Sequence, residues 1–200
     1  SQNRQAKKDS IRNQNDYRID LKSEFYPKIL RGIKNRPKKL YANGNIEILN
    51  SNCISIVGSR QNTKYGEKWC KKFVKELVKY DLKIVSGMAL GIDWVAHKEA
   101  IKEGGKTIAV LPSGLNIITP SSNKKIADDI LNNGGLLVSE YSIDTIPTKY
   151  TFVKRDRIQS ALSDAIIVIK ADEKSGTMNA VKVAQNSNKY VTQYITNNNK

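Results

Sequence analysis

The sequence has few of the residues on which disulfide-bonded, metal-binding and membrane proteins depend. Cys53 and Cys70 are its only cysteines, and His97 is its only histidine. One cysteine falls in a predicted strand and the other in a predicted helix, without a CxxC motif or a His/Cys cluster, so we expect two buried free thiols and no metal site. No apolar run approaches the length of a membrane span, and the polar, basic N-terminus does not resemble a signal peptide. We therefore expect a cytoplasmic protein that does not enter a membrane.

Two widespread nucleotide-binding motifs are also missing. The sequence contains no GxxxxGK[ST] loop, which excludes an ATPase of the P-loop kind, and the run GSRQNTKYG that begins at Gly58 does not fit GxGxxG. Asp93 could bind a ribose hydroxyl, but a residue in the first turns of a helix more often caps it. His97 follows four residues later, and no second carboxylate or thiol can be tied to it by spacing. We expect packing and hydrogen-bonding roles for both residues, no catalytic residues and no cofactor.

What the sequence has in excess is positive charge. Lysine and arginine total 34 residues against 19 for aspartate and glutamate, which gives a net charge of +15. Residues 1–40 hold 12 basic and 4 acidic residues, so about half of the excess lies in this leading segment. An excess this large favours a polyanionic partner, most simply nucleic acid. The alternative is a lysine- and asparagine-rich composition in which the lysines only solvate helix faces.

From residue 53 onward, short apolar runs alternate with helical patterns. Strands are predicted at residues 53–57, 82–86, 106–111, 135–139, 164–169 and 189–193, and helices at 64–79, 91–103, 123–133, 153–162 and 176–187. Apolar strands are typical of a parallel sheet covered on both faces, and the alternation predicts a three-layer α/β fold. We expect residues 1–24 to be a basic, flexible segment, residues 25–195 to form the domain, with 26–45 as a brace laid on it, and residues 196–200 to fray.

Ligands of an open parallel sheet bind beyond the carboxyl ends of its strands. Five predicted strands are followed there by glycine, serine or charged residues: Gly58-Ser59-Arg60, Ser86-Gly87 through Gly91 to Asp93, Pro112 to Leu115, Glu140-Tyr141, and Lys174-Ser175-Gly176-Thr177. The first two resemble junctions where backbone N–H groups and a helix N-terminus meet an anion. For any single glycine, a plain tight turn is the commoner explanation. Their shared edge predicts a phosphate-lined crevice, which Arg60 makes cationic.

The stretch from Pro147 to Ile158 interleaves aromatic and basic side chains. It holds Tyr150 and Phe152 together with the cations Lys149, Lys154, Arg155 and Arg157. Aromatic rings that stack on bases, beside cations that follow the phosphates, are typical of sites for single-stranded nucleic acid. The alternative is a surface helix start in which Phe152 joins the core and Arg155 pairs with Asp156 or Glu140.

Together these segments resemble the DNA-processing protein A family (DprA, also called Smf). The resemblance extends from about Tyr26 to Val191, with ordered blocks at family-like intervals. The blocks are Tyr26-Pro27, Pro37, Leu40-Tyr41, Gly44-Asn45, Ile56-Val57-Gly58-Ser59-Arg60, Ser86-Gly87, Ala89, Gly91-Ile92-Asp93, Ala96-His97, Gly105, Thr107 to Leu111, Gly114-Leu115, Pro120, Ser139-Glu140-Tyr141, Phe152, Arg155, Arg157-Ile158, Leu162-Ser163-Asp164 and Lys174-Ser175-Gly176.

The resemblance implies an extended Rossmann-like fold that binds single-stranded DNA without a chemical reaction. It also implies homodimers, protection of incoming DNA in natural transformation or recombination, and loading of RecA. The residues it assigns to DNA binding are Gly58, Ser59, Arg60, Ser86, Gly87, Gly91, Lys149, Phe152, Arg155, Lys174, Ser175 and Gly176.

The chain departs from the family pattern at several positions. Asp156 and Lys170 replace the usual residues, Pro112 opens an altered turn, and no C-terminal winged-helix domain is expected. Asp156 places an acid beside the expected DNA pocket, where it could weaken or redirect the contact.

Two other functions use a similar crevice. One is nucleotide hydrolysis, as in the N-glycosidases that resemble lysine decarboxylases, and the other is sensing of a small nucleotide. Those hydrolases carry a catalytic glutamate soon after a Gly-Gly-x-Gly-Thr loop, whereas here Thr177 is followed by Met-Asn-Ala. The missing carboxylate argues against hydrolysis.

Overall fold

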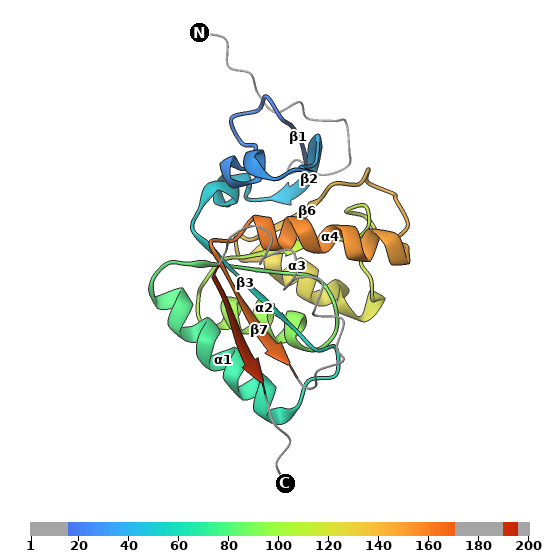
Figure 1. The fold of residues 1–200 in the computed structure, drawn as a ribbon. Coiled ribbons are helices and arrows are strands. Elements are labelled where there is room, and N and C mark those ends of the chain that lie inside the picture. Colours follow the sequence, from blue (N-terminus) through green and yellow to red (C-terminus); the bar gives the residue numbers. More distant parts are fainter. Residues whose placement is uncertain (1–15, 171–189, 196–200) are drawn as a thin grey trace.

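The computed structural model describes residues 16–170 and 190–195, which form three layers around one mixed sheet (Figure 1). The sheet has eight strands in the order β1-β2-β6-β5-β4-β3-β7-β8. The six strands from β6 to β8 pair in parallel, while β2 pairs antiparallel with both β1 and β6. The prediction of a three-layer α/β fold with a mostly parallel sheet is therefore confirmed.

The strands and helices follow the chain in regular alternation. The strands are β1 (Asp16–Asp20), β2 (Lys39–Gly44), β3 (Cys53–Gly58), β4 (Lys83–Ser86), β5 (Thr107–Val110), β6 (Leu136–Ser139), β7 (Ala165–Lys170) and β8 (Tyr190–Ile195). The α-helices are α1 (Lys64–Lys79), α2 (Ile92–Lys102), α3 (Lys124–Asn132) and α4 (Lys149–Ala161), and three short 3-10 helices span Lys28–Gly32, Ile46–Asn50 and Ser121–Asn123. The predicted helix at 176–187 lies outside the described residues.

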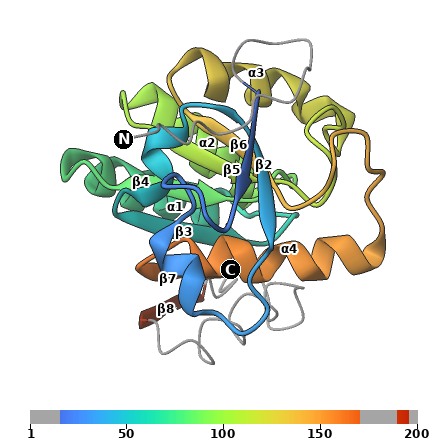
Figure 2. The same cartoon turned by 90° about the horizontal axis from the view of Figure 1, so that it is seen from above.

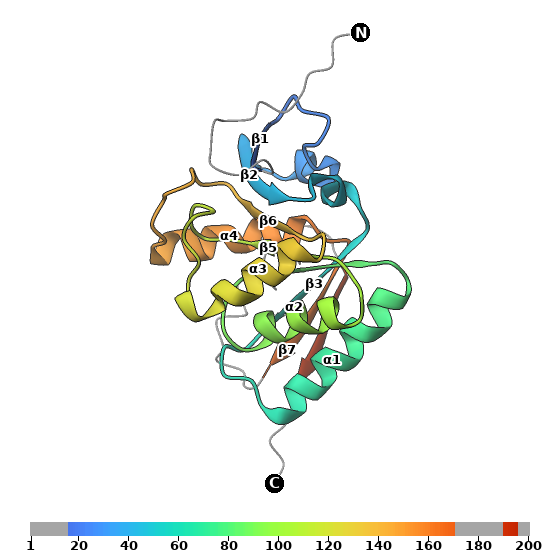
Figure 3. The same cartoon turned by 180° about the vertical axis from the view of Figure 1, so that it is seen from behind.

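Helices cover both faces of the sheet. Helices α1, α2 and α3 lie on one face, whereas α4 lies on the other together with the first 3-10 helix (Figures 2 and 3). Neighbouring strand residues point to opposite faces, so Ile84 packs in the cluster under α1 and α2 while Val85 packs in the cluster under α4. Burial on both faces explains why these strands are continuous apolar runs.

Local capping fixes where two of the helices begin. The Thr63 hydroxyl accepts a hydrogen bond from the Gly66 N–H at the start of α1. At α4, Thr148 and Thr151 form a reciprocal capping box, so this helix begins at Lys149, four residues before the predicted start at 153. The earlier start brings Lys149 and Phe152 onto the first turn of a regular helix.

The N-terminal part of the fold differs from the prediction. Residues 1–24 were expected to be flexible and 26–45 to form a brace, but Asp16–Asp20 and Lys39–Gly44 are strands that extend the main sheet. Ile19 and Leu40 are paired in register and fully buried. The alternation of apolar residues is only two or three residues long in each strand, so pairing of β2 with β6 and of β1 with β2, rather than local pattern, decides the structure.

Other expectations can be compared with the structure directly. Cys53 and Cys70 are free and buried, as predicted. Within residues 16–170 and 190–195, no cluster of three or more His, Cys, Asp or Glu side chains could hold a metal ion. In the same described part, no helix is long and apolar enough to cross a membrane.

The strand order creates one topological switch point. From β3 the chain proceeds outward through β4, β5 and β6, and then returns through α4 to place β7 on the other side of β3. The Ser59 N–H donates to the Ile169 carbonyl oxygen at 3.3 Å across this junction. Ligands of open α/β sheets bind beyond the carboxyl ends of the strands at such a point. Gly58-Ser59-Arg60 therefore occupies the position that the fold favours for a ligand.

Candidate nucleic-acid interface

Four of the five predicted segments follow β3, β4, β5 and β6 at the carboxyl edge of the sheet. They begin at Gly58, Ser86, Pro112 and Glu140, and the parallel pairing of these strands brings them to one edge. The fifth segment, Lys174-Ser175-Gly176, lies outside the described residues. The shared edge predicted from the sequence is thus present for the four segments that can be placed.

The outer layer of this edge is built by Arg60, Phe152 and Lys149. The Arg60 guanidinium carbon lies 5.6 Å from the centre of the Phe152 ring, although the two residues belong to different elements. Arg60 and Lys149 are exposed, and Phe152 is half-buried. No acidic residue lies in the first turn of α4, where the helix dipole already favours an anion. Two exposed cations and a half-buried aromatic ring therefore belong to the segments that meet at this edge.

Arg155 occupies a different layer, although the resemblance assigned it to DNA contact. Its side chain is only 7% exposed. Its Nη1 donates to the Val110 carbonyl oxygen at 2.8 Å, and its Nε donates to the Asp156 carboxylate at 3.1 Å. The alternative in which Arg155 pairs with Asp156 is the arrangement observed. Arg155 supports the edge from below instead of presenting its charge to solvent.

Two carboxyl groups share this buried position with Arg155. Burial raises the pKa of Asp93 and of Asp156, and the Arg155 charge opposes the rise in both cases. The Asp93 carboxylate also accepts from the Ala89 N–H at 3.2 Å. The acid at position 156, which departs from the family pattern, is therefore neutralised by Arg155 within the protein.

The loop between β4 and α2 was expected to cradle a phosphate, but protein groups fill it. Ser86 and Gly87 are buried, and the Ser86 hydroxyl donates to the Ile56 carbonyl oxygen at 2.7 Å. The Ile92 N–H at the start of α2 donates to the Ser59 carbonyl oxygen at 3.1 Å. The N–H groups of Ala89 and Ile92 therefore already have acceptors, which corrects the prediction for this loop.

Three glycines of the predicted site are required by close packing. A Cβ atom on Gly58 or Gly87 would lie 2.5 Å from the Ile169 carbonyl oxygen or the Asp93 carboxylate, respectively. Gly91 has φ +79°, and a Cβ there would overlap the Ser59 carbonyl oxygen. These glycines allow neighbouring loops to pack closely. A structural role of this kind was the commoner explanation expected for any single glycine.

His97 fixes the same loop from inside the fold. Its Nε2 lies 2.7 Å from the Gly87 carbonyl oxygen, and its Nδ1 lies 2.7 Å from the Thr107 hydroxyl. Because a carbonyl oxygen only accepts, Nε2 carries the proton of the neutral ring. Burial lowers the pKa of His97 to about 4, although the Gly87 hydrogen bond opposes the shift. The structural role predicted for this histidine agrees with these contacts.

A hollow of about 350 Å³ opens beside Gly91. Asn62, Leu90, Trp94 and Asn123 are among the residues that line it. Leu90 is 50% exposed, and the Lys98 ammonium lies 4.5 Å from the centre of the Trp94 ring. Apolar surface and amide groups thus lie next to the loop that carries Arg60.

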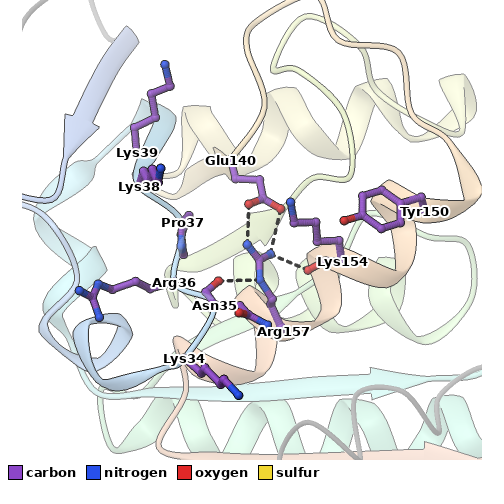
Figure 4. A pocket seen from close by; sticks show the side chains of 10 residues that line it. All are labelled: Lys34, Asn35, Arg36, Pro37, Lys38, Lys39, Glu140, Tyr150, Lys154 and Arg157. Atoms are coloured by element: carbon purple, nitrogen blue, oxygen red, sulfur yellow. Dashed lines mark hydrogen bonds and ion pairs between the residues drawn. The ribbon is translucent and has the colours of Figure 1, made fainter.

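The contact between α4 and the segment before β2 was not predicted from the sequence. Arg157 binds both oxygens of Glu140 at 2.8 and 2.6 Å, and its Nε donates to the Asn35 carbonyl oxygen at 3.0 Å. This contact closes one wall of a basic pocket between residues 34–39 and α4 (Figure 4). The density of lysine and arginine in 34–39 was the available signal, but the distance of 122 residues from Asn35 to Arg157 hid the contact.

Comparison with known proteins agrees with the fold. The sequence profile of the DNA recombination-mediator protein A family matches residues 18–200. Protein Smf of Escherichia coli (strain K12) is 40% identical over 170 residues, which cover 85% of this chain and 46% of that protein. The chain thus spans about half the length of the curated relatives it matches.

Two solved structures are also similar. The X-ray structure of DNA processing protein A from Streptococcus pneumoniae superposes with a TM-score of 0.83 at 35% identity, covering 90% of this chain and 63% of that one. A structure of DNA processing protein A from Helicobacter pylori gives a TM-score of 0.81 at 35% identity, covering 92% and 83%. The Helicobacter structure was described for the single-stranded DNA binding mode of that protein.

Proposed function

The chain belongs to the DNA recombination-mediator protein A family, and on that premise we propose that it binds single-stranded DNA at the carboxyl edge of its sheet. The observation that carries the proposal is the placement of Arg60 5.6 Å over the ring of Phe152 at the switch point between β3 and β7. A base stacks on Phe152, while Arg60 and Lys149 contact the neighbouring phosphates. The net charge of +15 attracts the strand.

The buried layer positions these contacts and does not touch the DNA. Asp93 and His97 hold the loop between β4 and α2, whose Gly91 packs against the backbone of Ser59 and Arg60, and Arg155 ties α4 to the end of β5. The hollow beside Gly91 accepts an unstacked base next to the loop that carries Arg60. Lys174, Ser175 and Gly176 follow β7 in the chain and complete the phosphate contacts in this proposal.

The wider role follows from the family. We propose that the protein forms homodimers in the cytoplasm, protects incoming single-stranded DNA during transformation or recombination, and delivers it to RecA. In this proposal it acts by binding and catalyses no reaction. Two observations support binding without catalysis: both ring nitrogens of His97 are engaged in structural contacts, and the Asp93 carboxyl is buried beneath the loop.

The test is a salt-titrated gel shift with single-stranded and duplex DNA. We expect tighter binding to the single strand, and Arg60→Ala should weaken it by about 1–3 kcal/mol. The free energy of unfolding should stay within about 0.5 kcal/mol, because Arg60 is exposed. Lys75→Ala, at an exposed position about three turns along α1 from the Arg60 loop, removes the same charge and is the matched control. Equal binding to both DNA forms, with no effect of Arg60→Ala, would refute the proposal, and release of free base from a nucleoside monophosphate would favour hydrolysis.

A further inference from the structure

A second basic surface lies on the other flank of α4. It is a pocket of about 720 Å³, which we call the basic pocket, lined by Lys34, Asn35, Arg36, Pro37, Lys38, Lys39, Glu140, Tyr150, Lys154 and Arg157 (Figure 4). Six of these residues are cations and one is an acid. None of the DNA contacts proposed above lines it, so its charge has no assigned partner.

The single acid of the basic pocket is already neutralised. Both oxygens of Glu140 bind the Arg157 guanidinium, and these two side chains are only 9% and 14% exposed. The Arg157 Nη1 also donates to the Lys154 carbonyl oxygen at 2.7 Å, which fixes the wall of the pocket. Among residues 16–170 and 190–195, no carboxylate forms an ion pair with Lys34 or Lys38. The Glu140–Arg157 ion pair thus fixes the wall of the pocket, while the positive charges of Lys34 and Lys38 are not balanced by a carboxylate of the described residues.

An exposed aromatic ring stands at the mouth of the basic pocket. Tyr150 is 68% exposed, and the Lys154 ammonium lies 5.6 Å from the centre of its ring. An exposed ring beside unpaired cations suits a ligand with flat faces and regularly spaced negative charges. An acidic peptide would use the lysines but leave the ring without a partner. The chemistry therefore favours single-stranded nucleic acid.

The basic pocket is continuous with the edge that carries Arg60. At 100° per residue, Phe152 falls on one flank of α4, Tyr150 and Lys154 fall on the other, and Lys149 and Val153 lie between them. Lys149 is exposed and Val153 is 55% exposed, so the face between the two flanks is open to solvent. One DNA strand can therefore reach both flanks by crossing the first turns of the helix.

We propose that the basic pocket is a second contact for the same single-stranded DNA, which crosses α4 from Phe152 to Tyr150 and places its next phosphates against Lys34, Lys38 and Lys39. This inference rests on the proposed function, because it extends the strand that is bound at Arg60. A short oligonucleotide occupies the Arg60 edge alone, whereas a longer one also fills the basic pocket.

The test compares oligothymidylates of about 6 and about 20 nucleotides, which lie near and beyond the site size of a small single-strand binding domain. In the double variant Lys34→Ala and Lys38→Ala, we expect about tenfold weaker binding of the longer strand, and a slope of log affinity against log salt reduced by about 1.4. Binding of the shorter strand should change less than about twofold, since it does not reach these lysines. The control variant Lys75→Ala and Lys106→Ala removes the same charge from exposed positions away from the carboxyl edge and should change neither.

A second variant tests the ring without altering the charge. Tyr150→Ala should weaken binding of the longer strand about fivefold, leave the shorter strand unchanged, and leave the salt slope of the longer strand as it was. The inference is wrong if the longer strand binds both variants as tightly as it binds the control. It is also wrong if both oligonucleotides weaken equally, or if an acidic peptide such as polyglutamate displaces the longer strand as well as free oligothymidylate does. Failure of the wild type to bind either oligonucleotide would instead overturn the proposed function.

Discussion

Arg60 and Arg155 lie at the same edge of the sheet but belong to different layers. Arg60 is exposed over Phe152, whereas Arg155 is buried against Val110 and Asp156. The buried layer consists of Arg155, Asp93, His97 and the glycine loop, and the outer layer consists of Arg60, Lys149 and Phe152. Residues assigned to one candidate site thus divide into those that hold the edge in place and those that are exposed to a ligand. Variants of the buried layer should lose stability, and variants of the outer layer should lose binding.

The strongest test of this division is removal of the buried cation. Arg155→Met should lower the free energy of unfolding by about 3–5 kcal/mol, because Asp93 and Asp156 lose the charge that compensates them. Urea unfolding measures the change. The deficit should be larger at pH 8 than at pH 5, since without Arg155 both buried carboxyl groups favour their protonated forms still more. Arg60→Met is the control, and an equal loss of stability in that variant would break the comparison.

A backbone test follows at Gly91. Gly91→Ala should lower the free energy of unfolding by about 3 kcal/mol, because it combines a positive φ with overlap at the Ser59 carbonyl oxygen. Gly104 also has a positive φ, but a Cβ there meets nothing within 4 Å, so Gly104→Ala should cost only about 1 kcal/mol. Thermal denaturation of both variants separates strain from overlap. Similar losses in the two would show that the Ser59 contact is unimportant.

The histidine predicts a pH dependence of stability. The pKa of His97 is about 4 in the folded protein and about 6.5 in an unfolded chain, so the unfolded state binds the extra proton between these values. The free energy of unfolding should therefore fall as the pH decreases from about 6.5 to about 4, by up to about 3 kcal/mol. Urea unfolding across this range measures it. His97 is the only histidine, so His97→Gln should flatten this component, while the raised pKa values of Asp93 and Asp156 act in the opposite direction in both proteins.

The smallest expected effect concerns Phe152 in the outer layer. Phe152→Leu keeps an apolar side chain on α4 but removes the ring, so single-stranded DNA binding should weaken by about 1–2 kcal/mol. Stability should change by less than about 1 kcal/mol, because the ring is only half-buried. Fluorescence anisotropy with a labelled oligothymidylate and a thermal melt provide the two readings. A loss of stability without a loss of affinity would place Phe152 in the supporting layer.

Local pattern was sufficient for much of the fold. The apolar runs at β3 to β8 and the helical periodicity at α1 to α3 correspond to the observed elements within a few residues. Strands β1 and β2 were missed because their apolar alternation is short and their stability comes from pairing with a distant strand. The start of α4 was placed late because its capping box consists of two threonines and not the usual pair with glutamate.

The candidate site, like the fold, could be predicted only in part. Proximity of Arg60 to Phe152 could be predicted because both segments follow parallel strands, whose carboxyl ends share an edge. Burial of Arg155 and Gly87 could not, since Arg155 bonds to Val110 and Gly87 packs against the Arg155 guanidinium, and both contacts join segments far apart in the sequence. The basic pocket could not be predicted either, because its walls come from residues 34–39 and from α4, which are far apart in the sequence.

The sequence by itself determined the layer architecture, the positive charge and the edge at which the segments of the candidate site meet. Periodicity, composition and strand order along the chain are local properties, so they can be read without coordinates. Only the tertiary structure decided which cations face solvent and which are enclosed. Arg60 and Arg155 are chemically identical, and their roles differ because neighbouring segments cover one with carboxylates and carbonyl groups and leave the other open beside Phe152.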